Sequence, residues 1–199
     1  MSQRNYPEIK VCGLTQPDEA KACADLGADA IGLVFFPTSP RNVSIEQAAA
    51  IKAVLPPSVR ATGIFVDPLM EDLLQTVEQT GLDVIQLHGI ESSKFISHLK
   101  QATDRKIIKA LFSERSPGPE LAPTYDVNGF LVECGRGPLP GGNAMAWDWG
   151  AARSFAQQHP LILAGGLGPE TVEVAITASL PDAVDASSAL EVQPGRKDL

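Results

Sequence analysis

Cys12 stands where a short apolar run gives way to a polar loop. Residues 10–15 read KVCGLT, and the QPDE that follows, with its proline and two acids, indicates the start of a helix. A thiol between a strand end and a helix N-terminus often has a lowered pKa, which suits a base or a nucleophile. Free cysteine is also among the most buried residue types, so simple packing is the other interpretation.

Polar residues follow other short apolar runs along the chain. Glu133 comes directly after 129–132, and Asp185 closes 183–185. Polar groups gathered at one end of otherwise apolar strands indicate a ligand more readily than packing. The candidate site residues are therefore Cys12, Arg41, Asp67, Gln86, His88, Glu133, Gly165, Gly166, Asp185, Ser187 and Ser188. Of these we expect Gln86, His88 and Asp185 to contact a substrate.

Some of the polar residues also have a structural interpretation. His88 in QLHG fits a role in capping its loop better than that of a catalytic base. Asp67 precedes Pro68 and reads as a helix cap, as does Asp148 between two tryptophans. Cys23, in the first helical segment, is expected in the core.

Strand and helix signals alternate along the chain. The expected strands are 9–11, 30–35, 59–66, 84–87, 106–111, 129–132, 161–164 and 183–185. The expected helices are 17–26, 45–54 with Ser44 and Gln47 as a capping box, 69–80, 92–99, 149–158 and 169–178. The proline-rich segment 116–125 is too broken for a regular helix.

Eight strand signals, most of them followed by a helix, predict an α/β fold: one (β/α)8 TIM barrel over residues 1–199. An open doubly wound sheet is the competing architecture, but its glycine fingerprint is absent from CGLT. Such barrels usually need about 250 residues, so this one is compact. We expect the fifth helix to be irregular and the eighth to be short or missing. In the latter case, either the terminus is trimmed or a partner covers the face between the last strand and the first.

Two glycine- and serine-containing loops follow the seventh and eighth strands. They read AGGLGPE and DASSALE, where barrels of this kind commonly hold a phosphate on backbone N–H groups. A lone Gly-Gly pair would indicate only a tight turn. Because Ser187 and Ser188 lie in the adjacent loop, the pattern favours a phosphorylated small-molecule substrate.

Composition excludes several other classes of protein. The chain has 199 residues, 44% hydrophobic and 20% charged, and no apolar run approaches the roughly 18 residues of a membrane span. A net charge of −8 disfavours a nucleic-acid surface. Three scattered cysteines and an N-terminus without an apolar core favour a cytoplasmic protein without a secretory signal. The histidines, at 88, 98 and 159, lack metal-ligand spacing.

Taken together and in order, the motifs resemble those of phosphoribosylanthranilate isomerases, barrel enzymes of tryptophan biosynthesis. The resemblance covers nearly the whole chain, and the ordered set is far more specific than any single motif. The motifs that carry it are KVCGLT, GADAIGLVFFPTSPRNVS, GIFVD, VIQLHG, PGGNAMAWDW, LILAGGL and VDASSALEVQPGRKD.

The resemblance implies an Amadori rearrangement of an aminoaldose to an aminoketose, without cofactor or metal. Cys12 falls on the family's general base, which as thiolate removes the proton from carbon 2 of the sugar. Glu133 stands in place of the aspartate that protonates the ring oxygen. Arg41 matches the residue that holds the anthranilate carboxylate. The phosphate would be held by Gly165, Gly166, Ser187, Ser188 and Ala189.

The sequence departs from the family pattern at several points. Glu133 replaces an aspartate, Ala144 and Ala189 stand where the family usually has glycine, and the last helix is missing. These departures leave open a weakened or repurposed barrel that binds a sugar phosphate. A related isomerase of the histidine pathway, with two aspartates, fits less well because Cys12 occupies the first base position. The sequence is compatible with a monomer or a homodimer.

Overall fold

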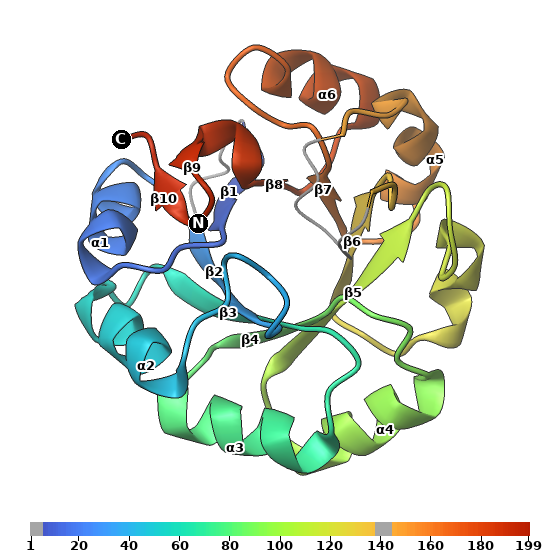
Figure 1. The fold of residues 1–199 in the computed structure, drawn as a ribbon. Helices are drawn as coiled ribbons and strands as arrows, with labels where there is room; N and C mark the ends of the chain where they lie inside the picture. The colour runs from blue at the N-terminus through green and yellow to red at the C-terminus, as the bar shows by residue number, and fades with distance from the viewer. Residues whose placement is uncertain (1–5, 138–144) are drawn as a thin grey trace.

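The computed structural model describes residues 6–137 and 145–199. Within them, eight parallel strands close into a barrel in chain order, surrounded by helices (Figure 1). β1 pairs with both β2 and β8, so the barrel has no free edge. The expected (β/α)8 barrel is confirmed. Its strands are β1 (Glu8–Cys12), β2 (Ala30–Phe35), β3 (Arg60–Phe65), β4 (Val84–Leu87), β5 (Lys106–Phe112), β6 (Gly129–Glu133), β7 (Leu161–Ala164) and β8 (Ala183–Ala186).

The first four helices lie within residues 17–102. They are α1 (Pro17–Asp25), α2 (Ile45–Val54), α3 (Met70–Thr80) and α4 (Ser93–Ala102). Ser44 Oγ accepts from the Gln47 N–H at 3.2 Å while Gln47 Oε1 accepts from the Ser44 N–H at 2.9 Å, so the expected capping box is confirmed. Cys23 is buried in α1, as expected.

The outer layer becomes irregular after β5. The proline-rich segment forms a short 3₁₀-helix, Pro119–Thr124, as its prolines predicted. The expected helix 149–158 is shorter: a 3₁₀ turn, Trp149–Ala152, leads into α5 (Arg153–Ala156). Asp148 does cap this segment, by accepting from the Gly150 N–H. α6 (Val172–Ser179) then precedes β8.

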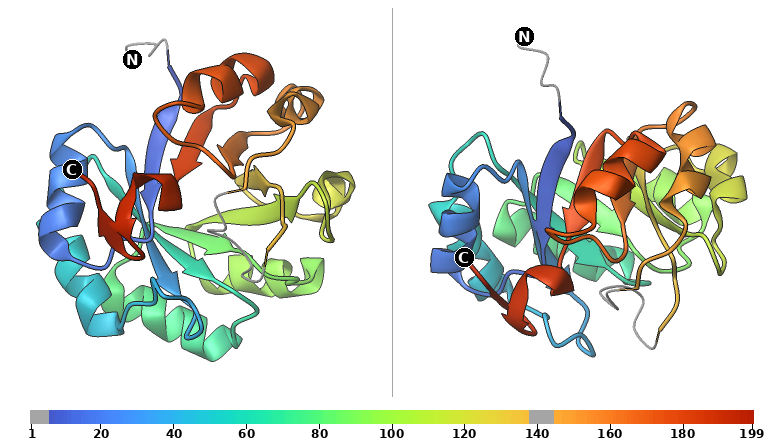
Figure 2. Two further views of the ribbon diagram at one scale, coloured as in Figure 1. Left: turned by 45° about the horizontal axis from the view of Figure 1, so that its top comes forward. Right: turned by 90° about the horizontal axis from the view of Figure 1, so that it is seen from above.

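A small hairpin follows β8 where an eighth helix would begin. A 3₁₀ turn, Ser188–Leu190, leads into antiparallel β9 (Glu191–Gln193) and β10 (Arg196–Lys197). Figure 2 shows the hairpin beside α1 at one end of the barrel. The Lys197 N–H and the Arg196 guanidinium both donate to the buried Glu19 of α1. The outer face of β1 stays open only near its start, where Ile9 is 40% exposed, because Val11 on the same face is buried.

Three apolar clusters make up the core. Two of them pack the outward faces of the strands against the helices. The third fills the barrel interior with inward side chains, as the two-residue periodicity of strands requires. Its buried members are Val84, Ile108, Ala110, Phe112, Leu131 and Ala164.

A buried ion pair joins β5 to the loop after β4. Lys109, which is fully buried on β5, donates to Glu91 at 2.9 Å and to the Gly89 carbonyl at 2.7 Å. Burial lowers the pKa of Lys109, and Glu91 opposes that effect.

The expectation that Asp67 caps α3 is wrong: its carboxylate accepts from the Ile90 N–H at 2.7 Å. Asp67 therefore joins two loops.

Candidate active site

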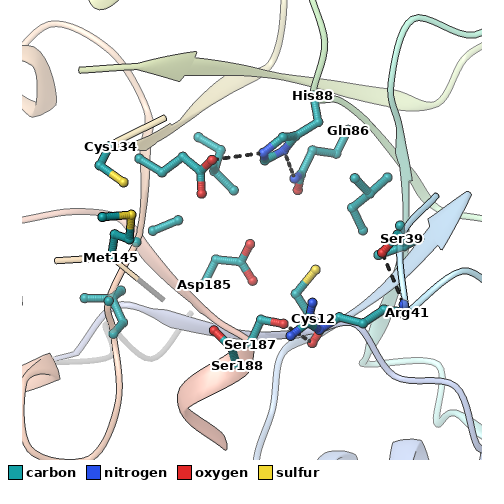
Figure 3. Close-up of a pocket in the computed structure, with 18 of the residues that line it drawn as sticks. Cys12, Ser39, Arg41, Gln86, His88, Cys134, Met145, Asp185, Ser187 and Ser188 are labelled. Atoms are coloured by element: carbon teal, nitrogen blue, oxygen red, sulfur yellow. Dashed lines mark hydrogen bonds and ion pairs between the residues drawn. The ribbon is translucent and has the colours of Figure 1, made fainter. Parts of the chain in front are cut away.

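All eleven residues assigned to the site in the predicted reaction line one pocket at the carboxyl ends of the strands. Figure 3 shows this pocket in close-up, with Cys12, Arg41, Gln86, His88, Asp185, Ser187 and Ser188 among the labelled side chains. These eleven residues come from six strands or the loops after them, which explains why residues so far apart in sequence meet. Asp67 is not among the lining residues. The eleven are Cys12, Arg41, Gln86, His88, Glu133, Gly165, Gly166, Asp185, Ser187, Ser188 and Ala189.

The Cys12 thiol sits at the end of β1 against a glycine of the next strand. Cys12 pairs in register with Gly32, and a Cβ on that glycine would lie only 2.7 Å from the sulfur. Gly32 therefore leaves the space that the thiol occupies. Burial raises the pKa of Cys12, the positive charge of Lys10 lowers it, and the net effect is a raised pKa, not the lowered one expected from its place before a helix.

Lys10 and Asp185 form a buried ion pair directly below the thiol. The two residues are register partners across β1 and β8, and their side chains meet at 2.8 Å. Burial alone lowers the pKa of Lys10, but the nearby Asp185 carboxylate and Cys12 raise it overall. Within the described residues, the second Asp185 oxygen, Oδ1, is buried without a hydrogen-bond partner.

Glu133 faces Cys12 from the opposite side of the barrel mouth. It is buried at the end of β6, with Oε1 3.4 Å from His88 Nε2. His88 Nδ1 in turn lies 2.9 Å from Gln86 Nε2, so the amide donates to Nδ1 and the ring proton on Nε2 faces Glu133. His88 was expected to cap its loop; instead, both ring nitrogens face side chains in the pocket.

Arg41 is held rigidly by a carboxylate from the C-terminal hairpin. Its Nε and Nη2 donate to the two oxygens of Glu191, at 2.9 and 2.7 Å. Lys197 Nζ donates to the same carboxylate at 2.9 Å. Burial raises the pKa of Glu191, but these hydrogen bonds and charges lower it overall. Two cations around one carboxylate leave a net positive charge beside the pocket.

The glycine loop after β7 bends away from the barrel at Gly165 and Gly166. Both have positive φ, 89° and 71°, and a Cβ on Gly166 would lie 2.6 Å from backbone atoms of Ala146. Two indole N–H groups hold the loop by hydrogen bonds: Trp147 donates to the Ala164 carbonyl, and Trp149 donates to the Gly165 carbonyl.

The serine loop after β8 reaches back to β1. Ser187 Oγ donates to the Cys12 carbonyl at 3.0 Å, which anchors this loop beside the thiol. Ala189 belongs to the 3₁₀ turn and has no positive φ, so alanine is unstrained there. Its methyl group lies against Gly168, which has no side chain. Ala144, the other alanine-for-glycine departure, lies outside the described residues.

Among the residues of this region that the sequence-based prediction missed, five stand out by their chemistry or position. Cys134, directly after β6, and Met145, further along the β6–β7 connection, line the pocket. Lys10, Glu191 and Lys197 surround Cys12 and Arg41 with charge. Lys10 had a signal that could have revealed it, because a lysine inside an otherwise apolar strand and two residues from Cys12 must share the thiol's face.

The described residues hold no group of three or more histidine, cysteine or acidic side chains that could bind a metal ion. In the same part of the chain, no helix is long and apolar enough to span a membrane.

Comparison with known proteins places this pocket in a family. Residues 9–199 match the model of the N-(5'-phosphoribosyl)anthranilate (PRA) isomerase family. The chain belongs to this family. It is 46% identical to the N-(5'-phosphoribosyl)anthranilate isomerase of Desulfatibacillum aliphaticivorans, over 96% of this chain and 88% of the relative. The corresponding protein of Microcystis aeruginosa is 41% identical, over 96% and 92%.

Solved structures agree with the assignment to this family. The phosphoribosyl anthranilate isomerase of Thermotoga maritima superimposes with a TM-score of 0.88 at 34% identity, covering 97% of this chain and 93% of that one. A second structure, of a phosphoribosyl anthranilate isomerase in complex with reduced 1-(o-carboxyphenylamino)-1-deoxyribulose 5-phosphate, gives a TM-score of 0.83 at 33% identity and the same coverage.

Proposed function

We propose that this isomerase family member catalyses the Amadori rearrangement of N-(5-phosphoribosyl)anthranilate to 1-(o-carboxyphenylamino)-1-deoxyribulose 5-phosphate in tryptophan biosynthesis. The observation that carries the proposal is the pairing of Cys12 and Glu133 across one pocket, in a chain whose family match covers residues 9–199. An acid and a base on opposite strands divide the two proton transfers that the reaction needs.

Glu133 acts first, as the general acid. Its carboxyl group protonates the ring oxygen of the sugar, the bond from that oxygen to carbon 1 breaks, and the anilino nitrogen supplies the electrons for a C=N bond. The His88 N–H at Glu133 Oε1 supports the carboxylate that remains. Gln86 fixes the ring of His88 in the orientation that this contact needs.

Cys12 then acts as the general base. Its thiolate takes the proton from carbon 2, and the C–H electrons form a C=C bond as the C=N electrons return to nitrogen. The resulting enol tautomerises to the ketone. The unpartnered Asp185 Oδ1 is suited to accept a hydrogen bond from a sugar hydroxyl.

The anionic ends of the substrate would be held by opposite sides of the pocket. Arg41 keeps Nη1 available for the anthranilate carboxylate, since Nε and Nη2 already serve Glu191. The phosphate would be held by Gly165, Gly166, Ser187, Ser188 and Ala189. Part of the binding would come from backbone N–H groups at the start of the 3₁₀ turn, because these groups have no hydrogen-bond acceptor within the turn.

The test is an isomerisation assay on substrate generated in situ, followed through the loss of its fluorescence. We expect turnover by the wild-type protein and almost none by Cys12→Ser, which keeps the size of the side chain but lacks a basic thiolate. Absence of turnover in the wild type, with binding of a sugar phosphate intact, would favour the repurposed barrel instead.

We further propose that residues 1–199 form one domain that works in the cytoplasm on a small phosphorylated substrate, without cofactor, metal, nucleic acid or membrane. The three unpaired cysteines, at 12, 23 and 134, and the net charge of −8 support this setting. The protein would be a monomer or a homodimer. Size-exclusion chromatography with light scattering distinguishes the two states.

A further inference from the structure

Lys10 is placed where it can act on the Cys12 sulfur. Residues two apart on a strand share a face, so both side chains point into the barrel, with Lys10 one layer below the thiol. The lysine is 4% exposed, and its Nζ is fixed at 2.8 Å from Asp185 on the neighbouring strand. A buried ammonium held in this way is a fixed positive charge directly under the thiol.

We propose that Lys10 is a positioning residue for the isomerisation: its ammonium, anchored by Asp185, stabilises the Cys12 thiolate before proton abstraction. The inference rests on the proposed role of Cys12 as base. Lys10 stays charged throughout, because the proton from carbon 2 moves to sulfur. It therefore contributes charge and no proton.

The electrostatics around the thiol support this role. Burial raises the pKa of Cys12, and Asp185 on β8 also raises it. Lys10 on β1 and Lys197 on β10 lower it. Arg41 also interacts with the thiolate, while His88 and Glu133 face it across the pocket. Of these cations, Lys10 lowers the pKa of the thiol most, so its removal should reduce the thiolate fraction of Cys12 most.

The test measures the thiolate directly, through the pH dependence of alkylation at Cys12. Iodoacetamide reacts with the thiolate, and mass spectrometry of the peptides separates Cys12 from Cys23 and Cys134. We expect Lys10→Met to lower the Cys12 rate at pH 8 by about tenfold or more, which corresponds to an upward shift of about one pKa unit or more. Lys10→Arg keeps the charge and should retain most of the rate.

The same variant should change the isomerisation assay in a characteristic way. With Lys10→Met, kcat falls most near neutral pH and recovers as pH rises. Lys109→Met is the matched control, because it removes another buried, carboxylate-paired lysine that lies on the helix-facing side of β5. It should lower stability and leave the alkylation profile of Cys12 unchanged.

Two outcomes would overturn the inference. One is an unchanged alkylation profile in Lys10→Met, and the other is an equal shift in Lys109→Met. Lys10→Met leaves Asp185 unpaired and could fail to fold for that reason. The double variant Lys10→Met/Asp185→Asn removes both charges, and its Cys12 should still be alkylated more slowly than that of the wild type. An equal or faster rate would refute the role of Lys10. Full isomerisation by Cys12→Ser would instead refute the proposed base and leave the thiolate effect standing.

Discussion

Glu133 reaches into the pocket with one methylene more than the aspartate expected at this position. A shift of about 1 Å in a catalytic group can cost on the order of 100-fold in rate. Here, the carboxylate is positioned by His88, which is itself fixed by Gln86, so the longer side chain is held rather than free.

For Glu133 we expect Glu133→Asp to keep or raise isomerisation, because the carboxyl group remains and returns to the family's usual length. Glu133→Ala should lower kcat by about 10²- to 10⁴-fold, the usual contribution of a general acid. Steady-state rates for both variants make the comparison. Full activity in Glu133→Ala would remove this residue from the mechanism.

Gly32 offers a second prediction at the scale of a single residue. In Gly32→Ala the new Cβ would lie 2.7 Å from the Cys12 sulfur and 3.0 Å from its Cα, so the thiol must move. We expect a fall of about 100-fold in kcat for a displacement of about 1 Å. Gly129→Ala is the control, since its Cβ meets neighbours only at 3.4 Å; equal losses in both variants would contradict the explanation.

At the scale of elements, the C-terminal hairpin takes the place of a helix and gains a role in the site. Glu191 begins β9 and holds Arg41 with two hydrogen bonds. We expect Glu191→Gln to raise KM by about tenfold with a smaller effect on kcat, because Arg41 loses its charged partner and its fixed orientation. Steady-state kinetics measure both constants, and an unchanged KM would show that Arg41 needs no such support.

The alternation of strands and helices was predictable because buried parallel strands are continuous apolar runs between glycine and proline signals. β2, β4 and β7 have the predicted bounds. Asp67 was misread because a cap and a loop-joining carboxylate look alike in sequence. Lys10 and Glu191 were missed for a different reason: their importance comes from the partners, Asp185 and Arg41, that the fold brings to them.

At the scale of the whole molecule, the Arg41–Glu191–Lys197 cluster makes the free energy of unfolding depend on pH. Folding lowers the pKa of Glu191 from its ordinary value of 4.5. The ionised carboxylate therefore stabilises the fold fully above pH 4.5, and this stabilisation is lost as the pH falls through the lower pKa of the folded state. At pH 7 Glu191→Gln should cost about 3 kcal/mol of unfolding free energy. Urea unfolding at pH 7 and pH 3 should show this difference shrinking in acid; a constant difference would contradict the linkage.

The pairing of β1 with β8 also determines when the site can form during folding. Lys10 and Asp185 are 175 residues apart in sequence, so a growing chain can make their contact only after β8 has been synthesised. Until β8 docks, Cys12 lacks the anchored charge beneath it. Because the folded environment raises the pKa of Cys12 overall, its alkylation should slow when the barrel closes, so that alkylation of Cys12 during refolding would report ring closure itself.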